Sequence, residues 1–166
     1  MHARLDAIDL AILAELQADG RMTNVELARR VGISAPPCLR RVRALEEAGV
    51  ISGYRALIDT RAVGLSVVFF VFVQLDQQTE AELSAFGVRV SGWKPVRECW
   101  TLSGETDFIL KCVAPDLDAF QKFVADLTAT HNVRNVRSSL ALKPVKEEAL
   151  AYVERDIGHG APTHEH

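Results

Sequence analysis

Residues 23–49 read TNVELARRVGISAPPCLRRVRALEEAG, and this stretch decides the fold of the N-terminal third of the chain. Thr23 favours a helix start, because its hydroxyl can accept a hydrogen bond from a backbone amide. In return, the side chain of Glu26 can accept a hydrogen bond from the amide of Thr23. Gly32 then breaks the pattern, since glycine accepts the left-handed backbone that ends many helices. The stretch therefore begins with one short helix.

A second helix follows after a turn of only two residues. Ser34 is a favourable cap, and Pro36 and Pro37 are tolerated in a first turn because the amide hydrogens that they lack would have no helical partner there. Gly49 ends this helix. Two short helices joined by a tight glycine turn predict a helix-turn-helix, whose second helix enters the major groove of DNA.

A longer amphipathic helix precedes this pair, and Asp19-Gly20 ends it with a turn. Its apolar side chains recur at the i, i+3 and i+4 spacing of a helix, at Leu5, Ile8, Ile12, Leu13 and Leu16. Gly49, Val50, Ile51 and residues 54–58 then have the character of a short extended segment, which serves either as a wing or as a tether to the rest of the chain.

The helix from Ser34 onward has an apolar side and a basic side. At about 100° per residue, one side carries Cys38, Leu39, Val42 and Leu45. Arg40 points away from that side, with Arg41 and Arg43 on the flanks. An arginine in this position can reach a guanine edge, and the small apolar residues of the outer side can contact a thymine methyl, namely Pro36, Pro37 and Ala44.

The charge distribution agrees with a DNA-binding surface. The whole chain has a formal net charge of −3, but residues 21–55 hold seven arginines and three glutamates, which is a local balance of +4. All the basic residues of this stretch are arginines, which suits bidentate contact with phosphate or guanine. A solvated helix surface would show the same charge, so charge alone leaves both interpretations open.

The second half of the sequence changes to strand-length runs that alternate with helical ones. The expected strands are residues 67–75, 96–102, 107–113 and 133–142, and the expected helices are residues 79–90 and 116–130. This βαββαβ order predicts a ferredoxin-like sandwich with both helices on one face of an antiparallel sheet. The fold class is therefore α+β, with a winged helix-turn-helix domain before the sandwich.

The first of these strands is apolar on both sides. Val68, Phe70 and Phe72 are as apolar as the residues that alternate with them, although a face that met water should be polar. Both faces of the sheet must therefore be covered, and the chain has no spare element for the second face. A partner subunit is the economical cover, whereas a monomer would leave a large apolar face in water.

Several other classes of protein are excluded by what the sequence lacks. It has no apolar run near the roughly 20 residues of a membrane span, no signal peptide, no glycine-rich phosphate loop, no paired-carboxylate site and no nucleophile motif. Cys38, Cys99 and Cys112 lie among apolar neighbours, which predicts buried, reduced thiols and no metal site. We expect a cytoplasmic protein without catalytic residues, metal or cofactor.

The chain resembles the Lrp/AsnC family of bacterial regulators over nearly its whole length. The matching strings are residues 5–9, 20–21, 26–28, 31–34, 38–42 and 45–51 in the first half, and residues 95–99, 103–108 and 136–139 in the second. The predicted parts are residues 3–64 for DNA binding, residues 65–147 for effector binding and oligomerisation, and residues 148–166 for a C-terminal tail. Double-stranded DNA and a small amino acid are the implied partners.

The resemblance also implies sites and an assembly. Dimers of such proteins pair through their sheets and associate further, here to an octamer, and the amino acid binds between dimers near a glycine-containing loop and the last strand. The implied effector-binding residues are Ser103, Gly104, Glu105, Asp107, Ser138 and Ser139. The candidate DNA-binding residues are Thr23, Asn24, Arg30, Ser34, Ala35, Pro36, Pro37, Arg40, Arg41 and Arg43.

Two alternatives share most of these features. Sirohaem decarboxylases resemble the same family, but their chemistry should place basic or histidine residues in the sheet pocket, and only His131 lies in the C-terminal domain. A chromosome-architectural protein that bends DNA would share every motif and differ only in its preference for specific over random DNA. The sequence names neither the amino acid nor the operator.

Overall fold

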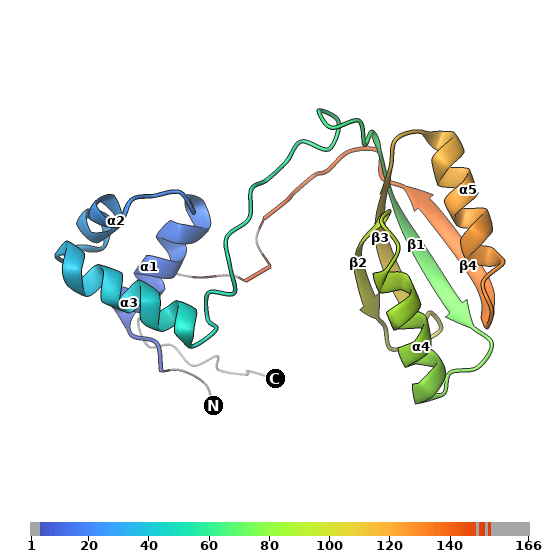
Figure 1. Cartoon of the computed structure of the whole chain (residues 1–166), viewed down its shortest axis with the longest axis horizontal. Coiled ribbons are helices and arrows are strands. Elements are labelled where there is room, and N and C mark those ends of the chain that lie inside the picture. Colours follow the sequence, from blue (N-terminus) through green and yellow to red (C-terminus); the bar gives the residue numbers. More distant parts are fainter. Residues whose placement is uncertain (1–3, 149, 152, 154–166) are drawn as a thin grey trace, which may run out of the picture. The chain divides into compact units, whose positions relative to one another are not determined.

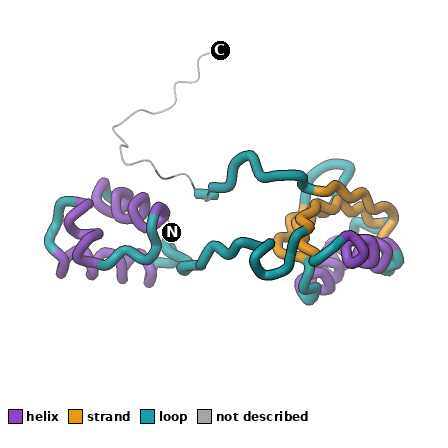
Figure 2. Tube along the Cα trace, turned by 90° about the horizontal axis from the view of Figure 1, so that it is seen from above, coloured by secondary structure: helices purple, strands orange, loops and turns teal. Residues whose placement is uncertain are grey.

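The computed structural model describes residues 4–148, 150, 151 and 153, and the chain divides into two compact units (Figure 1). The first unit contains the residues up to Leu57, and the second runs from Ile58 to Lys146. Within the described residues, the first unit holds helices and loops, and the second also holds strands (Figure 2). The predicted boundaries at residues 64 and 147 stay predictions, and most of the tail lies outside the described residues.

Three helices form the first unit, as the periodicity predicted: α1 (Ala7–Ala18), α2 (Asn24–Val31) and α3 (Ala35–Glu47). They enclose a small core of buried side chains, namely Ile12, Leu27, Ala28, Cys38 and Leu45. Gly32 ends α2 with φ of 75°, a backbone that glycine adopts without strain. This turn allows α3 to start only a few residues after α2 ends, which is the helix-turn-helix geometry.

The helix starts agree only in part with the predicted caps. Thr23 caps α2, and its hydroxyl accepts from the Glu26 amide at 3.3 Å. The expected return bond from Glu26 is replaced, because the Glu26 carboxylate accepts from Arg29 and Arg30 instead. A reciprocal capping box is present at α1, where Asp6 and Asp9 each accept from the amide of the other, at 2.9 and 3.1 Å.

No strand forms between α3 and the sheet: residues 50–66 are loops, bends and turns. The segment that we predicted to be extended after Gly49 forms neither a strand nor a hairpin. It leads from the last turn of α3 into the second unit.

The second unit has the predicted βαββαβ order: β1 (Val67–Leu75), α4 (Glu80–Ser91), β2 (Val96–Thr101), β3 (Phe108–Ala114), α5 (Leu117–Thr128) and β4 (Val133–Leu140). The four strands form one antiparallel sheet in the order β2-β3-β1-β4. The most apolar strand, β1, lies between β3 and β4, where it has a paired neighbour on each side. The ferredoxin-like prediction is confirmed.

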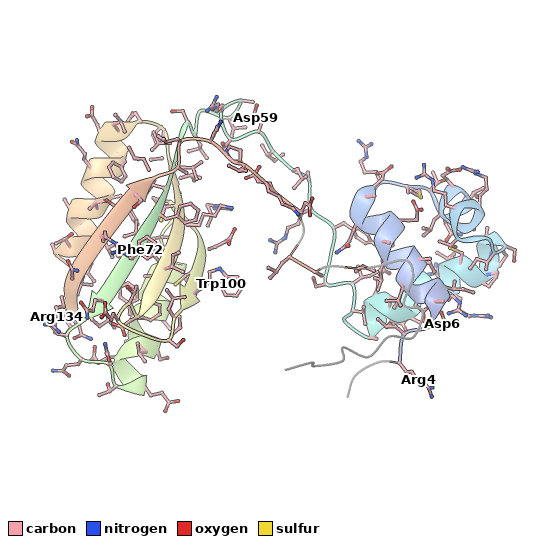
Figure 3. The ribbon with its side chains drawn as sticks, turned by 180° about the vertical axis from the view of Figure 1, so that it is seen from behind. Arg4, Asp6, Asp59, Phe72, Trp100 and Arg134 are labelled. Carbon is pink, nitrogen blue, oxygen red and sulfur yellow. The ribbon has the colours of Figure 1, made fainter. Side chains whose placement is uncertain are left out.

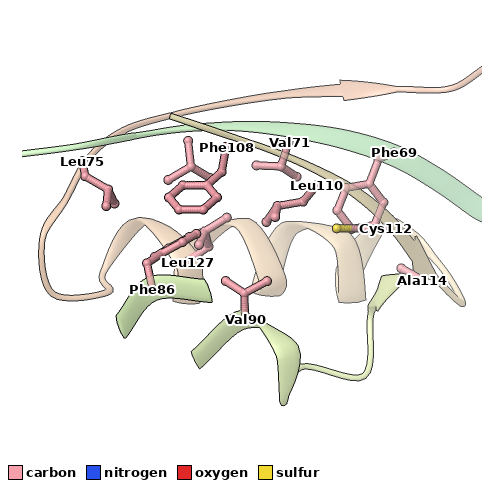
Figure 4. Close-up of a cluster of buried hydrophobic side chains, with 11 residues drawn as sticks. Phe69, Val71, Leu75, Phe86, Val90, Phe108, Leu110, Cys112, Ala114 and Leu127 are labelled. Atoms are coloured by element: carbon pink, nitrogen blue, oxygen red, sulfur yellow. The ribbon is translucent and has the colours of Figure 1, made fainter. Parts of the chain in front are cut away.

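Both helices cover the same face of the sheet, and the core lies between them and the strands (Figure 4). Alternate residues of β1 point into this core, and Phe69 packs edge-on against Phe120 and Phe123 of α5, with ring centroids 4.9 and 5.6 Å apart. Burial raises the pKa of the core Cys112 thiol to about 12, so this thiol stays neutral at ordinary pH.

The opposite face of the sheet, called the open face below, has no helix against it within the second unit. The strand register places on it Val68, Phe70, Phe72 and Gln74 of β1, Ile109, Lys111 and Val113 of β3, Glu98 and Trp100 of β2, and Asn135, Arg137 and Ser139 of β4. Phe70 and Phe72 are half-buried, and Trp100 is 54% exposed. Figure 3 labels Phe72 of β1 and Trp100 of β2. This apolar surface is the one for which the sequence predicted a partner.

One predicted burial is wrong. Cys38 and Cys112 are buried, but Cys99 is exposed, because β2 is an edge strand with a neighbouring strand on one side only. All three cysteines are free thiols. Among the described residues, no helix is long and apolar enough to span a membrane, and no cluster of three or more histidine, cysteine or acidic side chains has the arrangement of a metal site.

Candidate DNA-binding surface and ligand-binding hollow

The outer face of α3 carries the residues that can reach DNA. Arg40 and Arg43 are exposed there, one turn apart, and neither has an acidic partner among the described residues. They line a shallow hollow of about 300 Å³ whose wall consists of Pro36, Leu39, Arg40, Arg43, Ala44 and Glu47. Two guanidinium groups without a described acidic partner therefore share the outer side of α3, the helix that a helix-turn-helix places in the major groove.

Leu39 corrects the predicted apolar side of this helix. Cys38 and Leu45 are buried as expected, but Leu39 is 39% exposed and lines the outer hollow. The reason is angular, because one residue turns a helix by about 100°, so a residue next to Cys38 lies at the border of the buried side. Helix α3 therefore presents a large apolar side chain on the same surface as Arg40.

Arg41, a predicted DNA contact, has a structural role in the described unit. Its guanidinium donates to Asp6 at 2.7 Å and to Asp9 at 2.8 Å, which ties α3 to the start of α1. The amide of Asp9 and the guanidinium of Arg41 together lower the pKa of Asp6 below its ordinary value of 3.8. DNA contact by Arg41 stays a prediction, and it would compete with these two carboxylates.

Arg30 is bound in a similar way. It donates to Glu26 at 2.8 Å and to Glu15 of α1 at 3.1 Å, and the Glu15 side chain is almost fully buried. Hydrogen bonds from Arg29 and then from Arg30 lower the pKa of Glu26 to about 2, so this carboxylate stays charged through the physiological range. Of the arginines that we assigned to DNA, Arg40 and Arg43 are therefore the two with uncommitted side chains in the described structure.

The remaining predicted contacts surround the turn between α2 and α3. Thr23 and Ser34 are exposed, and Ala35 and Asn24 are half-buried. The Asn24 side chain donates to the Ala35 carbonyl at 2.8 Å, which holds the start of α2 against the start of α3. Its Oδ1 atom is buried and accepts no bond within the described residues. Asn24 and Ala35 therefore hold α3 in place against α2, and DNA contact by these four residues stays a prediction.

The predicted effector loop joins β2 to β3. Gly104 has φ of 122°, which only glycine adopts readily, and Ser103 and Glu105 beside it are exposed. Asp107 is 7% exposed, and its carboxylate accepts from the Leu75 amide at 2.7 Å, at the irregularity where β1 changes register against β4. One carboxylate oxygen of Asp107 therefore stabilises the end of β1.

Ser138 and Ser139 of β4 cannot both face one site. Ser139 is opposite Phe70 and lies on the open face, whereas Ser138 is opposite Val71 and lies on the side of the helices. The predicted effector residues are therefore spread over a loop and both faces of the last strand. The structure gathers only part of that set in one place.

A second hollow, of about 290 Å³, lies at the end of the open face beside the loop. It is lined by Phe72 and Gln74 of β1, Asn135 and Arg137 of β4, and Glu105 and Thr106 of the loop. Of the predicted effector residues, only Glu105 lines it. The guanidinium of Arg137 lies over the Phe72 ring, 4.7 Å from its centroid, and has no acidic partner among the described residues.

Sequence reasoning missed Arg137, Asn135 and Gln74. The signal that could have found them is the period of two in β4, where Asn135, Arg137 and Ser139 share one face. These polar residues lie beside Phe70, Phe72 and Gln74 of β1 on the open face, and only the register of the two strands reveals this. The hollow contains one cationic and one anionic side chain, so it suits a small molecule that carries both charges.

Both halves of the chain match known family models. Residues 5–52 match the winged helix-turn-helix DNA-binding model, and residues 68–151 match the Lrp/AsnC ligand binding domain. A helix-turn-helix joined to a ligand-binding sandwich defines a class of DNA-binding transcriptional regulators. The chain belongs to the Lrp/AsnC family of these regulators.

Relatives of known name agree with this assignment. The chain is 59% identical to the leucine-responsive regulatory protein of Rhizobium meliloti over 148 residues, which cover 89% of this chain and 95% of that protein. It is 39% identical to the leucine-responsive regulatory protein of Escherichia coli K12, over 86% of this chain and 88% of the relative.

Solved structures give the same result. A crystal structure of a Neisseria meningitidis transcriptional regulator in complex with L-methionine is similar at 41% identity and a TM-score of 0.82, over 87% of this chain and 94% of that one. An AsnC family regulator of Agrobacterium tumefaciens is similar at 33% identity and a TM-score of 0.83, over 89% and 97% of the two chains. The fold of both halves is therefore that of the family.

Proposed function

We propose that this regulator binds specific, pseudo-palindromic DNA sites as a homo-oligomer in the cytoplasm, and that a small amino acid changes its assembly or its DNA affinity. The observation that carries the DNA part is the outer face of α3, where Arg40 and Arg43 have no acidic partner among the described residues of a chain whose net charge is −3. No catalytic step is needed for this role.

The test of DNA reading compares two exposed arginines. Arg40→Ala should weaken binding to the preferred site by about 1–3 kcal/mol and relax the preference at one base pair, because a bidentate guanine contact is lost. Arg29→Ala is the matched control, since Arg29 on α2 is already bound to Glu26. Affinity should also fall steeply with salt, as phosphate contacts release counterions. Equal loss on specific and random DNA would reduce Arg40 to a phosphate contact.

The proposed oligomer rests on the open face. A second copy of the sheet would cover Phe70, Phe72 and Trp100, and further association of such dimers would give an octamer. Phe72→Glu should reduce the mass measured by light scattering, because a charge would be buried without a partner. Val88→Glu is the control, since Val88 of α4 is 73% exposed on the opposite side. An unchanged mass for Phe72→Glu would contradict the shared-sheet assembly.

The proposed effector is a free amino acid, in line with the L-methionine complex of the Neisseria relative. An amino acid needs donors for its carboxylate and an acceptor for its ammonium group. In the hollow beside the loop, Arg137 would take the carboxylate and Glu105 the ammonium, while the Phe72 ring would contact the side chain. Gly104, Ser103 and Ser139 lie close in sequence to these groups, and their roles, with those of Asp107 and Ser138, remain part of the proposal.

Calorimetry with the twenty amino acids tests the sensing role, with leucine and methionine first. Arg137→Met should abolish the heat of binding, because it removes the donor for the carboxylate but keeps much of the apolar stem. Arg134→Met on the same strand is the control. A coupling of about 1–3 kcal/mol would change DNA affinity by several-fold to about a hundredfold. No heat with any amino acid, together with unchanged DNA affinity, would mean that this regulator works without such an effector.

The two alternative roles predict different results. A chromosome-architectural protein would bind specific and random DNA with similar affinity, whereas a specific regulator typically prefers its site by about 10³-fold or more. A sirohaem decarboxylase would give an absorbance band after incubation with sirohaem. We expect a high specificity ratio and no such band.

A further inference from the structure

The first turn of α3 has fewer backbone donors than most helix starts. Pro36 and Pro37 carry no amide hydrogen, so of the first three helical residues only Ala35 can donate. The Ser34 hydroxyl makes no capping bond, because the amides that a cap residue normally meets belong to the second and third helical positions, which are prolines here. Helix starts usually hold phosphate through such amides, and this one is poorly equipped to do so.

The same turn presents apolar surface instead. Pro36 is exposed, and Leu39, three residues further on, is 39% exposed on the same side of the helix. Both side chains line the outer hollow of α3 together with Ala44. Leu39 is not part of the buried core of its unit, and it lines the same hollow as Arg40 and Arg43.

The charges around this hollow indicate what occupies it. Arg40 and Arg43 line it and lack acidic partners among the described residues, and Glu47 lines it further along the helix. The occupant must therefore be anionic beside the arginines and apolar where it meets Pro36 and Leu39. Duplex DNA meets both conditions in its major groove, where the C5-methyl group of thymine is the apolar feature among the base edges.

We propose that Pro36 and Leu39 form an apolar reader for one thymine methyl group in each half-site of the operator, beside the base or phosphate contacts of Arg40 and Arg43. This inference rests on the proposed sequence-specific DNA binding. It identifies one feature of the operator, a thymine methyl group, that the protein recognises without a hydrogen bond. The two residues determine specificity by contact area, so their contribution is insensitive to salt.

The test removes the methyl group from the DNA and leaves base pairing intact. A preferred site is first selected from random duplexes, and each thymine is then replaced singly by deoxyuridine. Binding of the full-length protein is measured by fluorescence anisotropy at two salt concentrations. We expect a loss of about three- to fivefold at one position of each half-site, the size expected for one methyl group removed from apolar contact, and the same loss at both salt concentrations.

Variants of the protein assign that loss to the two residues. In Leu39→Ala the ratio of the affinities for thymine and deoxyuridine at the sensitive position should fall toward one. Pro36→Ala should lower this ratio independently, and it also restores an amide donor to the helix start. Val88→Ala, an exposed residue of α4, should keep the full difference. Circular dichroism confirms that each variant is folded, and since Pro36 and Leu39 are both tested, failure of one variant to fold leaves the other.

Each contrary outcome has its own meaning. If no thymine responds to deoxyuridine on a preferred site, or if Leu39→Ala and Pro36→Ala keep the full response, the thymine reader is wrong while specific DNA binding stands. If the selection yields no preferred site, the proposed function itself fails. If affinity changes only when cytosines are methylated at C5, the pocket reads 5-methylcytosine and the thymine assignment is overturned.

Discussion

The two units of this chain are stabilised in different ways. The first has five buried core residues among those that the structure describes, and charged contacts join its helices, from Arg30 to Glu15 and from Arg41 to Asp6 and Asp9. The second has eleven buried core residues, with aromatic rings packed edge-on. The first unit can rely on polar contacts between its helices because the outer face of α3 is exposed, whereas the sheet relies on apolar packing on one face and has no helix of its own unit against the other.

The largest effect in this comparison should come from the core of the second unit. Phe69→Ala should lower the free energy of unfolding by about 3–5 kcal/mol, because a fully buried ring is replaced by a cavity. Denaturant unfolding measures the loss, and amide exchange shows where protection falls. We expect the fall in β1, β3 and α5, and Val88→Ala as a surface control should change little. An equal fall throughout α1–α3 would show that the two units unfold as one.

A polar tie inside the apolar unit should come next. Asp107→Ala removes the acceptor of the buried Leu75 amide and should cost about 1–3 kcal/mol. Asp107→Asn keeps one acceptor oxygen and should cost less. Denaturant midpoints of the two variants give the difference. If both variants are as stable as the wild type, this bond does not stabilise the end of β1.

The first unit should respond at its helix cap. Asp6→Ala removes the capping bond of α1 and should destabilise the unit by about 1 kcal/mol, with a smaller further loss from the partner of Arg41. Asp6→Asn keeps a capping oxygen and removes the charge, so it isolates the ion pair. Thermal unfolding followed by helical circular dichroism measures both. A larger loss in Asp6→Asn than in Asp6→Ala would contradict the assignment.

The smallest effect should be the acid response of Glu26. Hydrogen bonds from Arg29 and Arg30 lower its pKa from the ordinary 4.5 to about 2, so the folded state binds this proton less readily than the unfolded state. The resulting stability is present above about pH 4.5 and is lost as the pH falls toward 2. Glu26→Gln should therefore be slightly less stable than the wild type at pH 7, and the difference should shrink at pH 2. A constant difference would exclude the carboxylate as its cause.

Much of the fold follows from apolar periodicity. Both ends of β1 are predicted correctly because its run of apolar side chains has clear ends. Gly32 marks the turn before α3 because glycine readily adopts the positive φ that this position has. Leu39 and Cys99 were assigned the wrong burial for a shared reason. Each lies at a border, one at the edge of a helix face and the other on an edge strand, where the pattern of the element does not fix exposure.

The sites were less predictable than the fold because they depend on pairing between distant segments. Arg41 looks like a DNA contact in its own helix, and only the packing of α1 against α3 reveals Asp6 and Asp9 beside it. Arg137 and Glu105 meet at one hollow because β4 pairs with β1 and the loop before β3 lies at the same end. No spacing rule along the chain gives that neighbourhood.

The position of β1 between β3 and β4 has a consequence for synthesis on the ribosome. The strand is complete at Leu75, but its second neighbour is complete only at Leu140, which is 140 − 75 = 65 residues later. At roughly 5–20 residues per second, the nascent chain carries this apolar strand with an unpaired edge for about 3–13 s. Its run VVFFVFV has the composition of aggregation-prone segments. We expect slower translation after β1, or loss of chaperone capacity, to lower the soluble yield of this protein.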